Sequence, residues 1–317
     1  MYPLQFDPIF RYRLWGGRRL ANLLSANLPE GPVGEAWILS DRDDHTSHVS
    51  SGEFKGRTIE QLIDRFPEDM LGRLAGRFKR FPLLLKFLDA REMLSVQVHP
   101  DGKDGKTEAW VVLEAGAKSR IYAGLTEGTT TEGDLRKALD DDDLPEHLAS
   151  FHPAPGDAVF IPGGTVHSLG DDVLVFEVQQ NSDVTYRLYD WGHVDHRTGH
   201  SRPLQVDLAI GAVNFAECDA GLVRPVVEDA APLEREKLFD CDYFTLNRLR
   251  GDSPFLVGAS GAPSVLVCIA GAGQIASDAG GYAVRQGDVF LLPAAIGVCT
   301  CVPDSSAISV LEIAIPE

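Results

Sequence analysis

Two residues that could bind a metal ion lie on one face of a short predicted strand. Apolar and polar side chains alternate there, so Ser95, Gln97 and His99 point to the same side of the chain. A loop with two glycines can fold Glu108 back beside His99, and His167 follows much later in a turn. Two imidazoles, one carboxylate and one amide oxygen suit a borderline divalent cation, with Zn²⁺ the first expectation. These ligands leave the ion a net positive charge, unlike a Cys₄ structural site, which favours a catalytic role. The competing interpretation is an exposed strand face that binds nothing.

A second polar group lies further along the chain. In an extended segment, Asp183, Thr185 and Arg187 share one face. The Arg187 guanidinium is a rigid fork of donors that stays charged, so it could hold a phosphate or an enediolate. The competing interpretation is a structural ion pair between Arg187 and a nearby carboxylate.

The elements that must position these side chains are mostly short strands. Gly, Pro and Asp interrupt apolar runs at residues 110–113, 158–161, 173–178, 185–188, 265–269 and 289–292. Short strands with turn residues between them are typical of all-β sandwiches and barrels. Two segments favour helix instead, residues 58–78, which Pro67 interrupts, and residues 132–150.

A weak internal repeat predicts two related β-units. Residues 153–170 resemble residues 284–300, since each has a Gly-Asp turn, an apolar run, a proline and small residues. Only the first copy carries a histidine, His167, so we expect chemistry in the first unit alone. The mixed composition between the copies predicts a division into residues 1–232 and residues 233–317, the latter without metal ligands.

Composition excludes some classes of function. The 317 residues contain 29 basic and 47 acidic side chains, a formal net charge of −18, which argues against a nucleic-acid-binding face. An anionic small molecule is still compatible, because a pocket can be locally basic. We expect the acidic residues 140–143 to be a solvated helix end. We expect Cys299 and Cys301 to be buried core residues and His193, His196 and His200 to lie in a solvated loop, although both sets could also bind metal.

Targeting signals are not apparent in the sequence. The first residues do not combine a basic segment with an apolar one, and no apolar run approaches about 18 residues. We therefore expect a cytoplasmic protein that does not enter a membrane.

Several segments together resemble one family, the type I phosphomannose isomerases in their shorter bacterial form. They are WGG at residues 15–17, GEAW at 34–37, FPLLLKFLDAREMLSVQVHPD at 81–101, GKTEAW at 105–110, GDAVFIPGGTVHSLG at 156–170 and QQNSDVTYRLYDWG at 179–192. The succession of QVHP, K-x-E and PxGTxH is far more specific than any one of these motifs alone.

The resemblance implies a mainly β fold of two cupin-like (jelly-roll) barrels with a few connecting helices. It also implies the interconversion of mannose 6-phosphate and fructose 6-phosphate with one zinc ion per chain. The implied zinc ligands are Gln97, His99, Glu108 and His167. Further implied active-site residues are Lys106, Asp183 and Arg187, with Trp15 and Glu35 lining the pocket and Ser95 and Lys86 near the phosphate. Either Lys106 or Asp183 could transfer the proton, and the sequence does not choose between them.

Two positions depart from the family pattern. Leu169 replaces an aromatic residue of many relatives, and His193 replaces an arginine. Both concern the pocket rim, and hence sugar preference, more than the reaction itself.

Three alternatives stay open at this stage. One is a non-catalytic sugar-phosphate sensor, although the chain shows no basic DNA-binding helix. The others are a cupin isomerase acting on another phosphosugar and an iron oxygenase. Gln plus two His plus Glu is a poor match to the usual two-His, one-carboxylate iron site, which disfavours the oxygenase.

Overall fold

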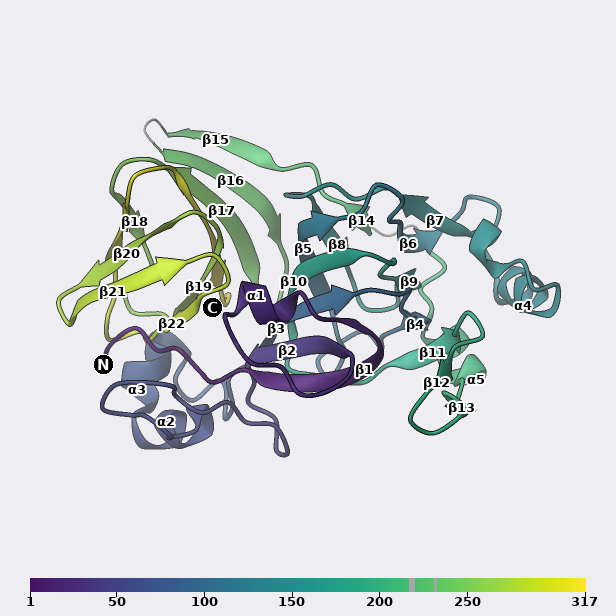
Figure 1. Ribbon diagram of the computed structural model, residues 1–317, viewed down its shortest axis with the longest axis horizontal. Coiled ribbons are helices and arrows are strands. Elements are labelled where there is room, and N and C mark those ends of the chain that lie inside the picture. The colour runs from purple at the N-terminus through teal and green to yellow at the C-terminus, as the bar shows by residue number, and fades with distance from the viewer. Residues whose placement is uncertain (217–219, 231–232) are drawn as a thin grey trace.

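The computed structural model describes residues 1–216, 220–230 and 233–317 and consists mainly of antiparallel β-sheet (Figure 1). The sheets form two sandwiches that lie next to each other, each built from one larger and one smaller sheet. The predicted mainly β class with a few helices is therefore confirmed.

The first sandwich contains every strand that carries a predicted site residue. Its larger sheet has the order β1 (Ile9–Gly17), β2 (Val33–Leu39), β3 (Leu83–Ala90), β10 (Val173–Gln180), β5 (Glu108–Ala115), β8 (Ala158–Ile161) and β14 (Gly221–Leu222). Its smaller sheet has the order β11 (Tyr186–Tyr189), β4 (Val96–Val98), β9 (His167–Ser168), β6 (Ile121–Leu125) and β7 (Leu148–Phe151). A separate hairpin joins β12 (Val194–Asp195) to β13 (His200–Ser201).

The second sandwich repeats much of this arrangement. Its larger sheet has the order β15 (Val226–Ala230), β16 (Leu233–Asp240), β17 (Thr245–Gly251), β24 (Ile308–Ala314), β19 (Ser264–Ala270) and β22 (Val289–Leu292). Its smaller sheet has the order β18 (Phe255–Val257), β23 (Cys299–Pro303), β20 (Ala272–Ser277) and β21 (Gly280–Arg285). The repeated segment forms β8 and β9 in the first sandwich and β22 and β23 in the second. Strand pairing passes from the first unit to the second between Leu222 and Val226. The predicted division at residue 232 lies outside the described residues and stays a prediction.

Apolar cores lie inside each sandwich and between the two. Trp110 and Val175 belong to the core of the first sandwich. Cys299 and Cys301 are buried in the core of the second, as predicted. A third, larger core joins the outer face of β3, β10 and β5 to strands β17, β19 and β24, so the sandwiches share buried surface.

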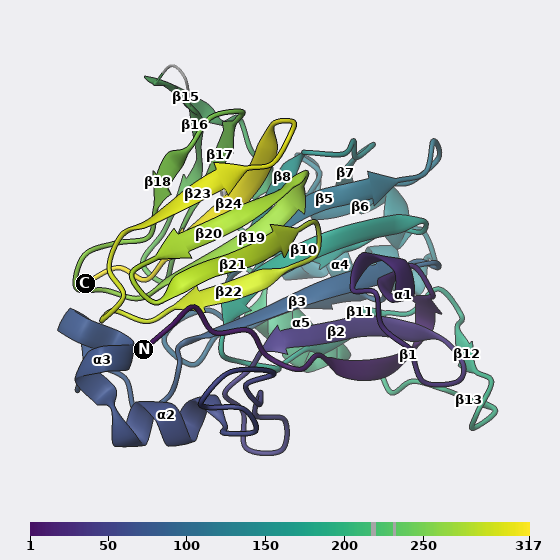
Figure 2. The ribbon, with the colours of Figure 1, turned by 60° about the vertical axis from the view of Figure 1, so that its left-hand side comes forward.

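The helices are short and lie at the edges of the sheets. They are α1 (Leu20–Leu23), α2 (Ile59–Arg65), α3 (Pro67–Leu71), α4 (Glu132–Asp140), α5 (Val206–Ala212) and the 3₁₀ turns η1 (Gly72–Leu74) and η2 (Leu144–His147). Figure 2 shows α2 and α3 at the base of the second sandwich, close to the N-terminal segment. Proline fits the first turn of a helix but not its interior, and Pro67 begins α3, which confirms the predicted interruption.

The helix predicted for residues 132–150 is wrong beyond Asp140. The chain forms a 3₁₀ turn and then strand β7, which pairs with β6. Edge pairing with an existing sheet outweighs the weak helical propensity of this polar segment. Asp140, Asp141 and Asp142 are exposed at the end of α4, as expected for a solvated acidic run. No helix among the described residues is long and apolar enough to cross a membrane.

Candidate metal centre and active site

One wall of the site is a row of side chains across the smaller sheet of the first sandwich. Gln97 of β4 lies opposite His167 of β9 and opposite Arg187 of β11. Directly opposed residues in antiparallel strands project from the same face. Strand pairing therefore brings together three predicted residues that are up to 90 positions apart in sequence.

The opposite wall is a row across the larger sheet. Lys86, Glu177 and Trp110 occupy opposed positions on β3, β10 and β5, and Trp37 of β2 is opposed to Lys86. Lys86 and Glu177 are almost fully buried and their charged atoms are 3.1 Å apart. The Trp110 indole donates a hydrogen bond to Glu177 (3.2 Å). A buried charged pair in the middle of a sheet is costly unless it is satisfied, and here the ammonium and the indole both contact the carboxylate.

The loop between β4 and β5 brings His99 and Glu108 together. The Lys106 amide donates to the Pro100 carbonyl (3.0 Å), which closes the loop on itself. Gly105 makes this closure possible, because a Cβ there would lie 2.5 Å from the Pro100 oxygen. The predicted return of Glu108 to the side of His99 is therefore confirmed.

His99, Glu108 and His167 form a compact group that could hold a metal ion. Their ligand atoms all lie within 4.8 Å of one another, and all three side chains are buried. Each histidine Nε2 lies 3.5 Å from a different oxygen of Glu108. Among the described residues, this is the one such group of His, Cys, Asp and Glu side chains, and it does not include His193, His196 or His200.

The hydrogen bonds around this group fit a metal site. The Nδ1 atoms of His99 and His167 each lie 2.8 Å from a backbone carbonyl, of Val184 and Thr165 respectively. Donation from Nδ1–H leaves the Nε2 lone pair free for a metal, as in many histidine metal sites. In addition, Glu108 Oε1 is buried with no hydrogen-bond partner. A buried carboxylate whose two oxygens each face an imidazole Nε2, one of them without a hydrogen-bond partner, fits a cation site.

Gln97 stands at the edge of this group. Its amide nitrogen lies 3.2 Å from His167 Nε2, and its oxygen accepts a hydrogen bond from Ser95 (3.3 Å). The two ends of a glutamine amide are assigned from such contacts, and a metal would require the oxygen to face His167.

Electrostatics keep the ligands in their metal-binding forms. Burial and then the Lys106 ammonium lower the pKa of His99 to about 3, and burial also lowers the pKa of His167. Both imidazoles are therefore neutral at pH 7. Burial opposes ionisation of Glu108, but the Lys106 ammonium lowers its pKa well below the ordinary value. Burial likewise opposes the charge of Lys106, while Glu108 and Glu177 raise its pKa.

Lys106 contacts both an imidazole and the carboxylate of this group. Its Nζ lies 2.9 Å from His99 Nε2 and also donates to Glu108 Oε2. This position places an ammonium group beside the candidate metal centre and on the wall of the neighbouring cavity.

Glu35 belongs to a second charged cluster on β1 and β2. Arg13 donates to both of its oxygens (2.7 and 3.1 Å), and Trp37 donates to one of them (2.6 Å). Burial opposes ionisation of Glu35, but Arg13 and Lys86 lower its pKa to about 2. The carboxylate is therefore charged and oriented at neutral pH.

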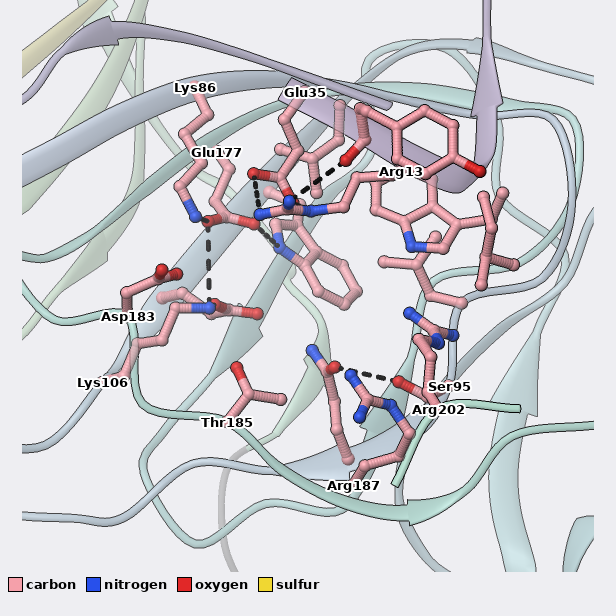
Figure 3. Close-up of a pocket in the computed structure, with 18 of the residues that line it drawn as sticks. Arg13, Glu35, Lys86, Ser95, Lys106, Glu177, Asp183, Thr185, Arg187 and Arg202 are labelled. Carbon is pink, nitrogen blue, oxygen red and sulfur yellow. Dashed lines mark hydrogen bonds and ion pairs between the residues drawn. The ribbon is translucent and has the colours of Figure 1, made fainter. Parts of the chain in front are cut away.

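A cavity of about 350 Å³ joins these groups (Figure 3). It is lined by all the predicted site residues except His99 and His167, namely Trp15, Glu35, Lys86, Ser95, Gln97, Lys106, Glu108, Asp183 and Arg187. The two histidines lie directly behind it and contact Glu108. No carboxylate of the described residues lies within ion-pair distance of Arg187, so the structural ion pair considered above is not formed.

Sequence reasoning missed several cavity residues. Arg13, Glu177 and Arg202 were not singled out, yet all three line the cavity. The available signals were a charged residue inside the apolar run of β10 and the alternation of Arg11, Arg13 and Trp15 on β1. Of the two departing positions, Leu169 is buried in the core, and His193 lies near Asp190 and Glu92 rather than in open solvent.

The fold and the site together define a class. A cupin-like β-sandwich with a His–Glu–His group that could hold a metal ion, at the wall of a polar cavity, is an architecture suited to chemistry on a small polar molecule.

Comparison with known proteins identifies the family. Residues 4–126 match the catalytic domain model of type I phosphomannose isomerase. The chain is 33% identical over 314 residues to the mannose-6-phosphate isomerase ManA of Bacillus subtilis, covering 93% of this chain and 94% of that protein. It is 31% identical over 313 residues to the probable mannose-6-phosphate isomerase GmuF of the same organism, covering 94% and 96%. The crystal structure of a mannose 6-phosphate isomerase from Bacillus subtilis superposes with a TM-score of 0.89 at 27% identity, over 99% of this chain and 100% of that one. The chain belongs to the type I phosphomannose isomerase family of enzymes, as the motifs indicated.

Proposed function

We propose that the protein is a zinc-dependent aldose–ketose isomerase that interconverts mannose 6-phosphate and fructose 6-phosphate through an enediolate. The observation that carries the proposal is the buried His99–Glu108–His167 group at the wall of the cavity. The names of the relatives indicate mannose 6-phosphate as the substrate. The cavity is lined by charged side chains, which suit a phosphosugar.

The proposed metal ligands are Gln97, His99, Glu108 and His167, which would hold one zinc ion per chain. Two neutral imidazoles and one carboxylate suit Zn²⁺ and leave it a net positive charge. When bound, the ion would supply a Lewis acid for the oxygens at carbon 1 and carbon 2.

The protein's own residues would stabilise and move charge around the sugar. Arg187 lines the cavity and forms no ion pair with a carboxylate of the described residues, and it is proposed to stabilise the oxyanion that develops in the enediolate. Lys106 and Asp183 both line the cavity and are the two candidates for transferring the proton between carbon 2 and carbon 1. Trp15 and Glu35 are proposed to form the sugar-facing wall, and Ser95 and Lys86 to contact the substrate.

A direct assay tests the reaction. Purified protein is incubated with mannose 6-phosphate, and fructose 6-phosphate is measured with and without a chelator, alongside metal analysis of the same sample. We expect turnover that the chelator abolishes and that added Zn²⁺ restores, with close to one zinc per chain.

Other outcomes would select the alternatives. Tight binding of mannose 6-phosphate without turnover would favour a non-catalytic sugar-phosphate-binding cupin. Turnover of a different phosphosugar at a much higher kcat/KM would favour an isomerase with another substrate. Restoration of turnover by Fe²⁺ but not by Zn²⁺ would refute zinc as the working metal.

A further inference from the structure

Two arginines share one side of the cavity. Arg187 comes from β11, and Arg202 follows β13 at the end of the β12–β13 hairpin. Figure 3 shows their guanidinium groups near Ser95, apart from Lys86, Lys106 and Asp183.

Arg202 is held in a fixed orientation by Asp190. Its Nε donates to Asp190 Oδ2 (2.9 Å), and its Nη2 donates to the other carboxylate oxygen. Asp190 is buried, so this two-pronged pair is shielded from solvent. An arginine has five N–H groups, so the pair leaves the Nη1 group free to bind a ligand. Tyr12 of β1 fixes the same hairpin by donating to Asp195 (2.8 Å).

Arg187 is less well satisfied than Arg202. One of its Nη1 hydrogens goes to the Pro203 carbonyl (2.9 Å), and its Nε is buried with no partner. Burial and then the charge of Arg202 lower the pKa of Arg187. Asp190 is ion-paired with Arg202 but not with Arg187, so the two guanidinium groups leave this side of the cavity positively charged. A site of this kind favours an anion with oxygen acceptors for both forks.

Lys86, which the family resemblance places near the phosphate, is in a different electrostatic situation. Its ammonium lies 3.1 Å from Glu177 and over the Trp37 ring, 5.2 Å from the ring centroid. The positive charge of Lys86 is therefore largely neutralised within the protein.

We infer that Arg202, oriented by Asp190, completes a subsite with Arg187 and Ser95 for the phosphate monoester of the substrate. This inference rests on the proposed function for the identity of the substrate. The sugar then extends from this subsite toward the His99–Glu108–His167 group, and Arg202 becomes a residue that determines specificity for phosphorylated over free sugars.

The test combines equilibrium binding with kinetics in the metal-loaded enzyme. Inorganic phosphate is titrated calorimetrically into wild type and Arg202→Ala, and kcat and KM for mannose 6-phosphate are measured for both. A hydrogen bond between charged groups is strong, so we expect phosphate Kd and substrate KM to rise roughly ten- to hundredfold in the variant. We expect kcat to change by less than about threefold, because the phosphate is remote from the reacting carbons.

Three further variants keep the result interpretable. Arg202→Lys retains the positive charge but loses the paired donors of the guanidinium group, so we expect an intermediate loss of phosphate affinity. This variant also replaces Arg202→Ala in the test if the alanine variant does not fold. Arg224→Ala removes the same charge from an exposed position between β14 and β15 and should leave phosphate Kd unchanged. Lys86→Met should weaken phosphate binding much less than Arg202→Ala does.

Two results would contradict the proposed phosphate subsite. An unchanged phosphate Kd in folded, metal-loaded Arg202→Ala or Arg202→Lys would overturn the subsite, as would phosphate binding that depends on Lys86 but not on Arg202. Phosphate calorimetry needs no turnover. Arg202-dependent phosphate binding without isomerase activity would therefore refute the proposed reaction and leave the subsite intact.

Discussion

The side chains around the cavity divide into those that would hold a metal and those that would act on the substrate. His99 offers a lone pair from a neutral, buried imidazole, whereas Arg187 contacts none of the three grouped ligands in any recorded hydrogen bond or ion pair. We therefore expect His99→Ala to lose both metal and turnover. Arg187→Ala should keep its metal and lose turnover by at least about 100-fold, as removal of an oxyanion-stabilising donor does. Metal analysis and steady-state kinetics on the two variants check this, and near-normal turnover in Arg187→Ala would contradict the proposed role.

Glu35 provides a test of electrostatics at a single residue. Its pKa is about 2 in the folded protein against an ordinary value of 4.5. A depressed carboxyl pKa stabilises the fold fully above pH 4.5, and this contribution is lost as the pH falls toward 2. We expect metal-free Glu35→Gln to be about 3 kcal/mol less stable than metal-free wild type at pH 7 in urea unfolding.

The same comparison at low pH tests the direction in which the stability difference changes with pH. At pH 3 the difference in the free energy of unfolding between wild type and Glu35→Gln should shrink to roughly half. At this pH Glu35 is protonated in the unfolded chain but still mostly ionised in the folded protein, so proton uptake on unfolding already offsets part of its stabilising effect. The exposed Glu53→Gln serves as the control and should change little at either pH. A gap that is constant or grows on acidification would show that the charge of Glu35 is not what stabilises the fold.

Sequence alone predicted some of these residues and missed others for a physical reason. Period-two alternation placed Ser95, Gln97 and His99 on one face, and the structure agrees. It could not reveal that Glu177 faces Lys86, because that contact depends on the register between β10 and β3, which are about 90 residues apart. The Asp190–Arg202 pair likewise depends on how the hairpin folds back.

At the level of elements, the loop between β4 and β5 determines whether His99 and Glu108, two of the proposed metal ligands, meet. Gly105 has no room for a side chain, since a Cβ would lie 2.5 Å from a backbone oxygen that cannot rotate away. We expect Gly105→Ala to displace the loop that carries Lys106 and Glu108. Metal affinity and turnover should fall at least about tenfold, and the free energy of unfolding should fall by about 1–3 kcal/mol, as with other overpacked sites.

The matched control is Gly211→Ala in α5. A Cβ there meets nothing within 4 Å, and alanine favours a helix over glycine. This variant should keep full metal content and equal or higher stability. If Gly105→Ala bound metal as tightly as Gly211→Ala, the loop would not be what sets the ligand geometry.

Strands marked by an apolar run in their own sequence were predictable. A segment whose structure depends on pairing with a strand elsewhere in the chain was not. The apolar runs at residues 158–161 and 289–292 are β8 and β22 with unchanged bounds. Residues 148–150 were assigned to a helix, because the edge of β6 that pairs with them in β7 is not visible in their own sequence.

At the level of the whole molecule, the repeat predicted two related units but not how they pack together. Both units place a long central strand between two neighbours, in the orders β3-β10-β5-β8 and β17-β24-β19-β22. Their outer faces then share one apolar core that also includes α2 and α3. This packing depends on the shape of both finished sheets, and no local pattern encodes it.

The shared core predicts that the two sandwiches unfold together. Phe244 is fully buried in that core and packs against Phe239, which in turn stacks on Phe160 of the first sandwich. We expect calorimetry to show a single thermal transition, with agreement between calorimetric and van't Hoff enthalpies. Phe244→Ala should lower stability by about 3–5 kcal/mol without splitting that transition, and it should leave kcat near the wild-type value at 25 °C. Leu256→Ala, at a position that is 63% exposed on β18, should change stability little. Two separate transitions, with loss of zinc binding tracking only one of them, would show that the sandwiches are energetically independent despite their common core.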